Sequence, residues 1–321
     1  MIQLKACLAL ELPPINRALN RALDRLPPPV LPVARHIFDA GGKRLRPLLT
    51  VLVARLLGHT DNGIQDLAVT LEMLHAATLL HDDVLDNALT RRGRPAAHTL
   101  WDASSVILAG DALLACANAL VAERGDPRLS LCFSKATSRT AAGEILEIAA
   151  QGRVDTTQEE YEDIVRGKTA WLIRAACEMG ALAANAAQSH VAAAAAYGEN
   201  LGMAFQLVDD ALDFALESVT GKPTGGDVRE GKFTPPVRLY RQSLPSGERT
   251  AFDAAFAARA ISPDEAAAIA ENIRTVGHDT ATRRQAEAFL ARARAALDNM
   301  PPGKDRDILH SMADHVRDRK K

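Results

Sequence analysis

The sequence predicts an all-α fold, and its composition gives the reasons. Apolar residues make up 47% of the 321 positions and aromatic residues only 4%, with Ala and Leu providing much of the apolar share. These two residues favour helices, whereas strands need runs of β-branched and aromatic side chains, which are scarce here. Gly and Pro concentrate between helical patterns, and no stretch has the composition of a flexible linker. Because a chain of this length can bury a large core, we expect one domain over residues 1–321.

The helical spacing of apolar residues predicts the elements in order. The first helix covers residues 1–26 and ends before Pro27, because three consecutive prolines cannot continue a helix. A short helix, a basic turn at 41–47 and a helix to about residue 57 come next, and Thr157 and Glu160 later form a capping box. The other predicted elements are helices at 65–87, 97–123, 127–151, 157–183 and 189–216, loops at 88–95 and 219–234, four helical segments beyond 234, and a frayed basic end at 317–321.

Charge and cysteine content exclude several classes of function. The formal net charge is -2, so the chain has no basic surface for a nucleic acid, and we expect no such partner. The four cysteines are scattered without a C-x-x-C pair, which predicts reduced, buried thiols in a cytoplasmic protein. No window of 18 uncharged apolar residues exists, so we expect no transmembrane helix. A hydrophobic substrate or product could still bring the protein to a membrane surface.

The first acidic cluster consists of Asp82, Asp83 and Asp86 within a predicted helix. Asp82 and Asp86 lie one turn apart on one face, and His75 lies about two turns upstream on the same stripe. Carboxylates at this density repel one another, so a cation between them is expected. Hard oxygen ligands suit Mg²⁺, which shares its remaining positions with water and phosphate oxygens. A solvated acidic face is the alternative interpretation.

A second cluster repeats the same spacing with Asp209, Asp210 and Asp213, and Gln206 lies one turn above them. Both clusters lie inside apolar helical stretches, where a polar outer face is least expected. Two such clusters could face each other across a cavity. Their joint occurrence favours metal binding over the alternative.

Basic residues flank the first cluster in sequence, and guanidinium and ammonium groups can hold a diphosphate. Lys168 and Lys232 suggest a nucleotide-binding loop, but Glu162 replaces a required glycine and Phe233 a required Ser or Thr. These lysines still fit a diphosphate if they reach it from the far wall of the cavity. The alternative for any single basic residue is ordinary surface charge. The flanking residues are Lys43, Arg46, His75, Arg91 and Arg92.

Four further polar residues have no assigned chemistry. His81 and His98 are expected to be structural hydrogen-bonding residues, because this is the commoner role of a lone histidine. Glu144 and Glu147, one turn apart on an apolar helix, are either partners of the basic groups or exposed.

The sequence strongly resembles the trans-polyprenyl diphosphate synthases, the prenyltransferases that elongate isoprenoid chains. The matching stretches cover most of residues 40–235 in the order and spacing of that family. They are GGKRLRP at 41–47, LHAATLLHDDVLD at 74–86, RRGRP at 91–95, LAGD at 108–111, GKT at 167–169, FQLVDDALD at 205–213 and GKPTGGDVREGKFT at 221–234.

The resemblance implies a helical bundle around a central cavity, a homodimer, and Mg²⁺ that bridges both acidic motifs to the diphosphate of an allylic primer. The implied metal ligands are Asp82, Asp83, Asp86, Asp209, Asp210 and Asp213. The implied allylic diphosphate ligands are Arg91, Lys168, Thr169, Gln206, Lys222 and Lys232, and those of isopentenyl diphosphate are Lys43, Arg46, His75 and Arg92.

The implied chemistry is ionisation of the allylic carbon–oxygen bond, helped by Mg²⁺ and by cations such as Arg91, Lys168 and Lys222. The double bond of isopentenyl diphosphate then attacks the carbocation, and a proton is lost. A side-chain nucleophile is not needed, which agrees with the lack of a Ser-His-Asp or Cys-His arrangement.

Product length depends on what closes the cavity below the first motif. Ala77 and Thr78 lie about a turn upstream of Asp82 and are small, where short-chain members commonly place an aromatic residue. We therefore expect products of twenty carbons or more, of the long-chain, quinone-tail type. Ala112 stands where long-chain members often carry Phe, so a geranylgeranyl product stays open.

Two other functions stay open. A class I terpene cyclase shares the fold, and a non-catalytic partner subunit of a heteromeric synthase is the binding-protein alternative. The two intact aspartate motifs weigh against both, and GGKRLRP weighs further against the cyclase.

Overall fold

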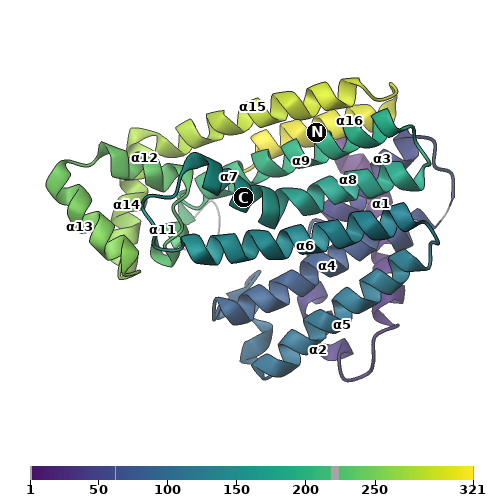
Figure 1. Ribbon diagram of the computed structural model, residues 1–321, viewed down its shortest axis with the longest axis horizontal. Coiled ribbons are helices and arrows are strands. Elements are labelled where there is room, and N and C mark those ends of the chain that lie inside the picture. Colours follow the sequence, from purple (N-terminus) through teal and green to yellow (C-terminus); the bar gives the residue numbers. More distant parts are fainter. Residues whose placement is uncertain (1, 62, 218–223, 321) are drawn as a thin grey trace. The chain divides into compact units, whose positions relative to one another are not determined.

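The computed structural model describes residues 2–61, 63–217 and 224–320 (Figure 1). In this part of the chain the fold is all-α apart from one short hairpin, whose strands β1 (Thr90–Arg91) and β2 (Arg94–Pro95) have two residues each. The helices before residue 200 are α1 (Ile2–Leu23), α2 (Leu31–Asp39), α3 (Leu45–Leu56), α4 (Ile64–Leu85), the 3₁₀ turn η1 (Ala97–Thr99), α5 (Ala103–Ala122), α6 (Pro127–Ala150), α7 (Gln158–Val165), the π-helical turn η2 (Arg166–Ala170), α8 (Trp171–Ala183) and α9 (Gln188–Leu212). The later ones are α11 (Gly226–Glu230), α12 (Pro235–Ser243), α13 (Ser246–Ala257), α14 (Pro263–Val276), α15 (His278–Asp298) and α16 (Lys304–Arg317).

The helix predictions are confirmed for the long elements and corrected at several boundaries. The capping box is present, because Thr157 Oγ1 accepts from the backbone N–H of Glu160 and the Glu160 side chain accepts from that of Thr157. The predicted helix 97–123 is divided, since Asp102 caps a new start of α5 by accepting from Ser105 N at 2.9 Å. The predicted helix 157–183 contains the π-helical turn η2. The four segments expected beyond residue 234 are five, α12 to α16.

The chain forms two compact units, each built from three stretches of sequence. The first unit comprises residues 1–137, 175–195 and 298–309, and the second comprises 138–174, 196–297 and 310–321. The boundaries between the units fall within α6, α8, α9 and α16 and at the end of α15. The single domain around a central cavity stays a prediction.

In the first unit α4 is the central helix and packs against α1, α3 and α5 (Figure 1). Its N-terminal two thirds is buried almost all round, with Leu67, Leu71 and Met73 at 0–1% exposure. A helix that is apolar on every side requires neighbours on every side. This buried stretch also holds the polar residues Thr70 and Glu72, and the first aspartate motif lies beyond it, at the C-terminal end of α4.

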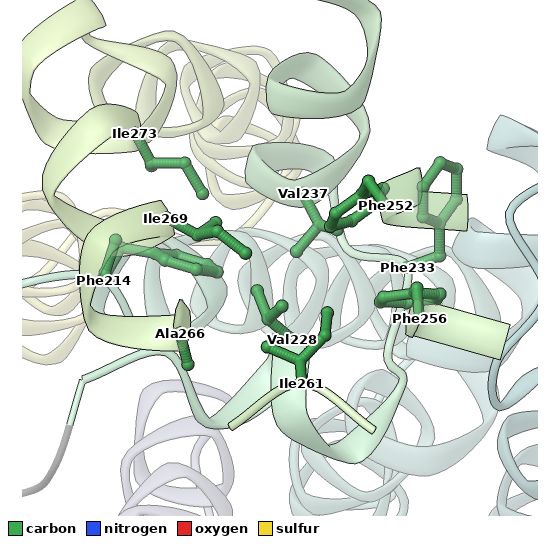
Figure 2. Close-up of a cluster of buried hydrophobic side chains, with 11 residues drawn as sticks. Phe214, Val228, Phe233, Val237, Phe252, Phe256, Ile261, Ala266, Ile269 and Ile273 are labelled. Atoms are coloured by element: carbon green, nitrogen blue, oxygen red, sulfur yellow. The ribbon is translucent and has the colours of Figure 1, made fainter. Parts of the chain in front are cut away.

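In the second unit an apolar cluster joins α11 and α12 to α13 and α14 (Figure 2). Phe233 meets Phe256 edge-on at 5.8 Å between ring centroids, and Phe256 stacks on Phe252 at 5.5 Å. Val228 and Phe233 belong to this cluster, and they flank Lys232 in sequence. The cluster therefore fixes the short segment that carries Asp227 and Lys232. Its members are Phe214, Val228, Phe233, Val237, Phe252, Phe256, Ile261, Ala266, Ile269, Ala270 and Ile273.

Two surface features bear on the composition-based expectations. Among the described residues one helix, α5, is long and apolar enough to cross a membrane, and 33% of its most apolar window is buried. All four cysteines are free thiols; Cys7, Cys132 and Cys177 are buried as predicted, whereas Cys116 is only half-buried.

Candidate active site

The first unit brings together three of the predicted diphosphate-binding residues. Arg46 lies in the first turn of α3, His75 lies on α4, and Arg92 follows strand β1. Loss of hydration lowers the pKa of Arg46, and the neighbouring Arg92 lowers it further. Burial and the same two arginines hold the pKa of His75 well below its usual range. The cluster is a concentration of cationic donors, including the unpartnered Nε of Arg46, and an anion would relieve its mutual repulsion.

The GGKRLRP turn shapes this cluster through Arg44, which the sequence analysis did not single out. Arg44 has a left-handed backbone at φ 49° and turns inward, where Nη1 lies 3.1 Å from Glu72 Oε1 and Nη2 donates to Phe38 O at 3.2 Å. A Cβ on Gly42 would lie 2.9 Å from Nη1 of Arg44 and 3.2 Å from Nη1 of Arg92. Both arginine ends could move aside, but Gly42 has φ 155°, which residues with a side chain rarely adopt, so the turn favours glycine here. Arg92 donates to the carbonyl of Gly41. Lys43, between Gly42 and Arg44, is exposed.

The first aspartate motif lies at the end of α4 with the predicted spacing. The backbone N–H of Asp86 donates to Asp82 O at 2.8 Å, so the two residues are one helical turn apart. Asp82 is half-buried and Asp86 exposed, whereas Asp83 is fully buried and paired with Arg91. The motif thus offers two accessible carboxylates and one that binds an arginine.

The structural role of His81 is confirmed. His81 Nε2 lies 3.0 Å from Ile107 O, and a Cβ on Gly110 would lie only 2.3 Å from that nitrogen. Gly110 of the LAGD stretch therefore makes room for His81 between α4 and α5. His98 has a buried Nδ1 with no hydrogen-bond partner among the described residues, so its role stays a prediction.

The second unit contains a cavity of about 300 Å³. Its walls include every described residue predicted for this part of the site, namely Lys168, Thr169, Gln206, Asp209, Asp210, Asp213 and Lys232. Lys222 lies outside the described residues. The cavity also includes side chains that the sequence analysis did not assign, among them Glu147, Tyr161, Asp227 and Arg319.

The π-helical turn η2 places Lys168 in this cavity. A Cβ on Gly143 of α6 would lie 2.3 Å from the backbone nitrogen of Lys168, so the two helical segments touch backbone to backbone. Lys168 Nζ pairs with Glu147 and lies 2.8 Å from Glu144 Oε2, while Lys232 Nζ lies 3.4 Å from Glu147 Oε1. Of the two interpretations of Glu144 and Glu147, partnership with the basic groups is therefore correct. π-Turns of this kind occur frequently at functional sites.

The carboxylates of the second motif lie in a hydrogen-bonded network. Gln206 Nε2 donates to Asp210 Oδ1 at 2.8 Å, Thr169 Oγ1 donates to Gln206 Oε1 at 2.8 Å, and the hydroxyl of Tyr161 donates to Asp210. Asp213 Oδ2 accepts from the backbone N–H of Asp227 at 3.0 Å. Each predicted residue thus fixes the orientation of another.

This network fits a divalent cation. Burial raises the pKa of Asp210 to about 7 and that of Asp213 to about 6, since anionic charge is costly there without a counter-ion. Asp227 adds a third carboxylate, with a buried Oδ2 that has no partner among the described residues. Oxygen donors of this kind suit a hard cation such as Mg²⁺.

Three residues of the cavity were not predicted from the sequence, although for one of them the sequence contained an indication. Asp227 lies inside the GKPTGGDVREGKFT stretch and was not assigned, although its spacing before Lys232 was visible. Tyr161 has no signal beyond its place in an amphipathic helix. Arg319 was expected in a frayed end, which is wrong: its side chain is 9% exposed and pairs with Asp209.

The chain is similar to known proteins over most of its length. The family model described as Polyprenyl synthetase matches residues 28–273. The chain is 36% identical over 309 residues to Heptaprenyl diphosphate synthase component 2 of Geobacillus stearothermophilus, covering 95% of each chain. It is 37% identical over 227 residues to Geranylgeranyl diphosphate synthase of Methanosarcina mazei, covering 67% of this chain and 70% of the relative. The polyprenyl synthase of Caulobacter crescentus CB15, solved in complex with calcium and isoprenyl diphosphate, matches with a TM-score of 0.93 at 35% identity, covering 99% and 98% of the chains.

Proposed function

The chain belongs to the polyprenyl synthetase family, and on that premise we propose that it condenses isopentenyl diphosphate with an allylic diphosphate, using Mg²⁺, to give polyprenyl diphosphates. It is a trans-prenyltransferase. The observation that carries the proposal is the cavity of the second unit, where Lys168 and Lys232 lie beside Asp209, Asp210 and Asp213. Cations and metal-binding carboxylates in one cavity suit a metal-bound diphosphate and suit few other ligands.

The proposed roles follow from these surroundings. Asp82 and Asp86 of the first motif would hold Mg²⁺ in the first unit, and the carboxylates of the second motif would hold it in the second unit. When bound, Mg²⁺ supplies positive charge to the departing diphosphate. Lys168 and Lys232 donate to the same diphosphate, and Glu147 holds both ammonium groups at this wall of the cavity. Thr169 and Gln206 orient Asp210.

The cationic cluster of the first unit is the proposed site of isopentenyl diphosphate. Arg46 and Arg92 lie close enough to His75 to lower its pKa, and a diphosphate would offset this positive charge. A site lined by cations suits the co-substrate, whose diphosphate is kept and not cleaved. Lys43 adds a point charge at the rim in this proposal.

We also propose that the enzyme is a cytoplasmic homodimer. Helix α5 is apolar, yet only 33% of its most apolar window is buried, and Ile107 and Leu108 are 41% and 63% exposed. A second copy of the chain could bury this exposed apolar face in a symmetric interface. The four free thiols support a reducing compartment.

The product is proposed to be a long-chain diphosphate, in agreement with the heptaprenyl relative, and the geranylgeranyl relative marks the lower bound of twenty carbons. The test is incubation of the purified chain with Mg²⁺, isopentenyl diphosphate and, separately, dimethylallyl, geranyl and farnesyl diphosphates. Mass spectrometry of the products should show discrete polyprenyl diphosphates of twenty or more carbons.

Three other outcomes have separate meanings. Products that stop at fifteen carbons would keep the chemistry and contradict the proposed length. Hydrocarbon release from an allylic diphosphate alone would indicate a terpene cyclase. A folded chain with no turnover would favour a partner subunit, as the name of the Geobacillus relative, a component 2, suggests for that protein.

A further inference from the structure

A residue near the C-terminus, Arg319, lies in the wall of the cavity in the second unit. Arg319 follows α16, and its side chain, 9% exposed, lines the cavity together with Lys168 and Lys232. Its guanidinium lies 4.1 Å above the ring of Phe205, and its own carbonyl accepts from Arg283 Nη1 at 3.1 Å. Backbone and side chain are therefore both fixed by residues of the same unit.

Only part of this guanidinium has a partner. Arg319 Nη2 lies 3.1 Å from Asp209 Oδ1, but the buried Nε and Nη1 have no hydrogen-bond partner among the described residues. An arginine cannot lose its charge, and a buried N–H without an acceptor is costly. Two unsatisfied donors on a cavity wall indicate a missing acceptor, and guanidinium groups match the geometry of phosphate oxygens.

The pairing with Asp209 gives the same indication. Lys168 and Lys232 have Glu147 as a shared partner, whereas Arg319 depends on a carboxylate that we assign to metal binding. When Asp209 binds a cation, its attraction for Arg319 weakens. The guanidinium is then a cation without a counter-ion, and the diphosphate is the anion that enters the same cavity.

We propose that Arg319 is a diphosphate-binding residue, held by Asp209 in the empty site and turned to the diphosphate oxygens in the loaded site. The inference rests on the proposed function, because it takes the cavity as the site of a metal-bound diphosphate. It gives the C-terminal end of the chain a direct part in substrate binding.

The test measures binding and not turnover. Isothermal titration calorimetry with inorganic diphosphate at saturating Mg²⁺ should show at least about a tenfold loss of affinity in Arg319→Gln, and a smaller loss in Arg319→Lys. The matched control is Arg317→Gln, since Arg317 is 46% exposed and pairs with Asp318 on the surface. That variant should bind diphosphate as the wild type does.

A second titration separates ligand binding from a structural role. With Mg²⁺ alone, Arg319→Gln should bind the cation at least as tightly as the wild type, because Asp209 no longer pairs with an arginine. A parallel loss of Mg²⁺ and diphosphate affinity would overturn the proposal and make Arg319 a structural clamp, as would unchanged diphosphate binding. If the wild type itself binds no diphosphate with Mg²⁺, the proposed function fails and not this inference alone.

Discussion

Asp83 is fully buried, and its Oδ1 accepts hydrogen bonds from both Nε and Nη2 of Arg91, at 2.8 and 2.5 Å. The resemblance implies that Asp83 binds metal, but these contacts favour a role in orienting Arg91 toward a diphosphate. We expect Asp83→Asn to raise the KM for the allylic substrate while leaving the Mg²⁺ concentration for half-maximal rate nearly unchanged. Removal of a buried ion-pair partner should also lower the free energy of unfolding by about 2–4 kcal/mol.

The comparison variant is Asp82→Asn, which changes a half-buried carboxylate of the same motif. It should raise the Mg²⁺ requirement and cost less stability, because this carboxylate is half-buried whereas that of Asp83 is fully buried. Steady-state kinetics at varied Mg²⁺ and urea denaturation check both variants. If Asp83→Asn raises the Mg²⁺ requirement as much as Asp82→Asn does, Asp83 is a metal ligand.

A methyl group on Gly143 should displace Lys168. In Gly143→Ala the new Cβ would lie 2.3 Å from the backbone nitrogen of Lys168, so the π-helical turn must move away from α6. We expect a loss of about 1–3 kcal/mol in the free energy of unfolding and a higher KM for the allylic diphosphate. Gly247→Ala is the control, since no heavy atom lies within 4 Å of its added Cβ in α13.

The control should be neutral or stabilising by about 0.5–1 kcal/mol, because Ala restricts the unfolded chain. Chemical denaturation measures the free energy of unfolding of both variants, and steady-state kinetics measures their KM for the allylic diphosphate. Equal behaviour of the two would mean that the contact between α6 and η2 does not position Lys168.

These contacts show why the site was only partly predictable. Apolar periodicity predicted the long helices, because burial of one face leaves a direct pattern. The turn η2 leaves the apolar pattern almost continuous, so residues 157–183 were predicted as one helix. Motif spacing predicted Asp209, Asp210 and Lys168. Tyr161, the partner of Asp210, belongs to no motif, and the spacing of Glu147 from Glu144 did not decide between a partner of Lys168 and an exposed residue.

Arg319 shows a second limit of sequence reasoning. It pairs with Asp209 across 110 positions, and its own neighbourhood is a short run of charged residues. Such a run is typical of a solvated terminus. Only the packing of the end of α16 within the second unit brings Arg319 to the cavity, and the local sequence does not indicate that packing.

The stability of the protein should depend on pH through His75. Its folded pKa lies well below the usual 6.5 because of burial and the nearby arginines, so below pH 6.5 the unfolded chain binds a proton that the folded chain does not. Acidification from pH 7.5 to 5.5 should therefore destabilise the wild type more than His75→Gln, by at most about 1.4 kcal/mol per pH unit below 6.5. Denaturation curves across this range measure the difference.

Inorganic diphosphate supplies the matched condition for the His75 experiment. An anion near Arg46 and Arg92 should offset their charge, raise the pKa of His75 and reduce the acid-induced loss in the wild type. If wild type and His75→Gln lost stability equally with falling pH, the titration of His75 would not contribute to this pH dependence.

Product length should respond to the residues just before the first motif. Ala77 is 1% exposed, and Thr78 is half-buried with its hydroxyl donating to His75 O at 2.9 Å. An aromatic ring at either position would narrow any passage beside this turn of α4. Each isoprene unit needs about one helical turn, roughly 5.4 Å, so blocking here should shorten products by several units.

Thr78→Phe is the sharper variant, because overpacking at the buried Ala77 would cost about 1–3 kcal/mol and blur the result. We expect Thr78→Phe to keep its condensation rate on geranyl diphosphate while the longest product falls toward fifteen or twenty carbons, as sized by mass spectrometry. Thr78→Val removes the hydroxyl without adding volume and should leave the products unchanged. If Thr78→Phe and Ala77→Tyr both gave wild-type products in folded protein, the floor of the cavity would lie elsewhere, and the small residues at 77 and 78 would not set the product length.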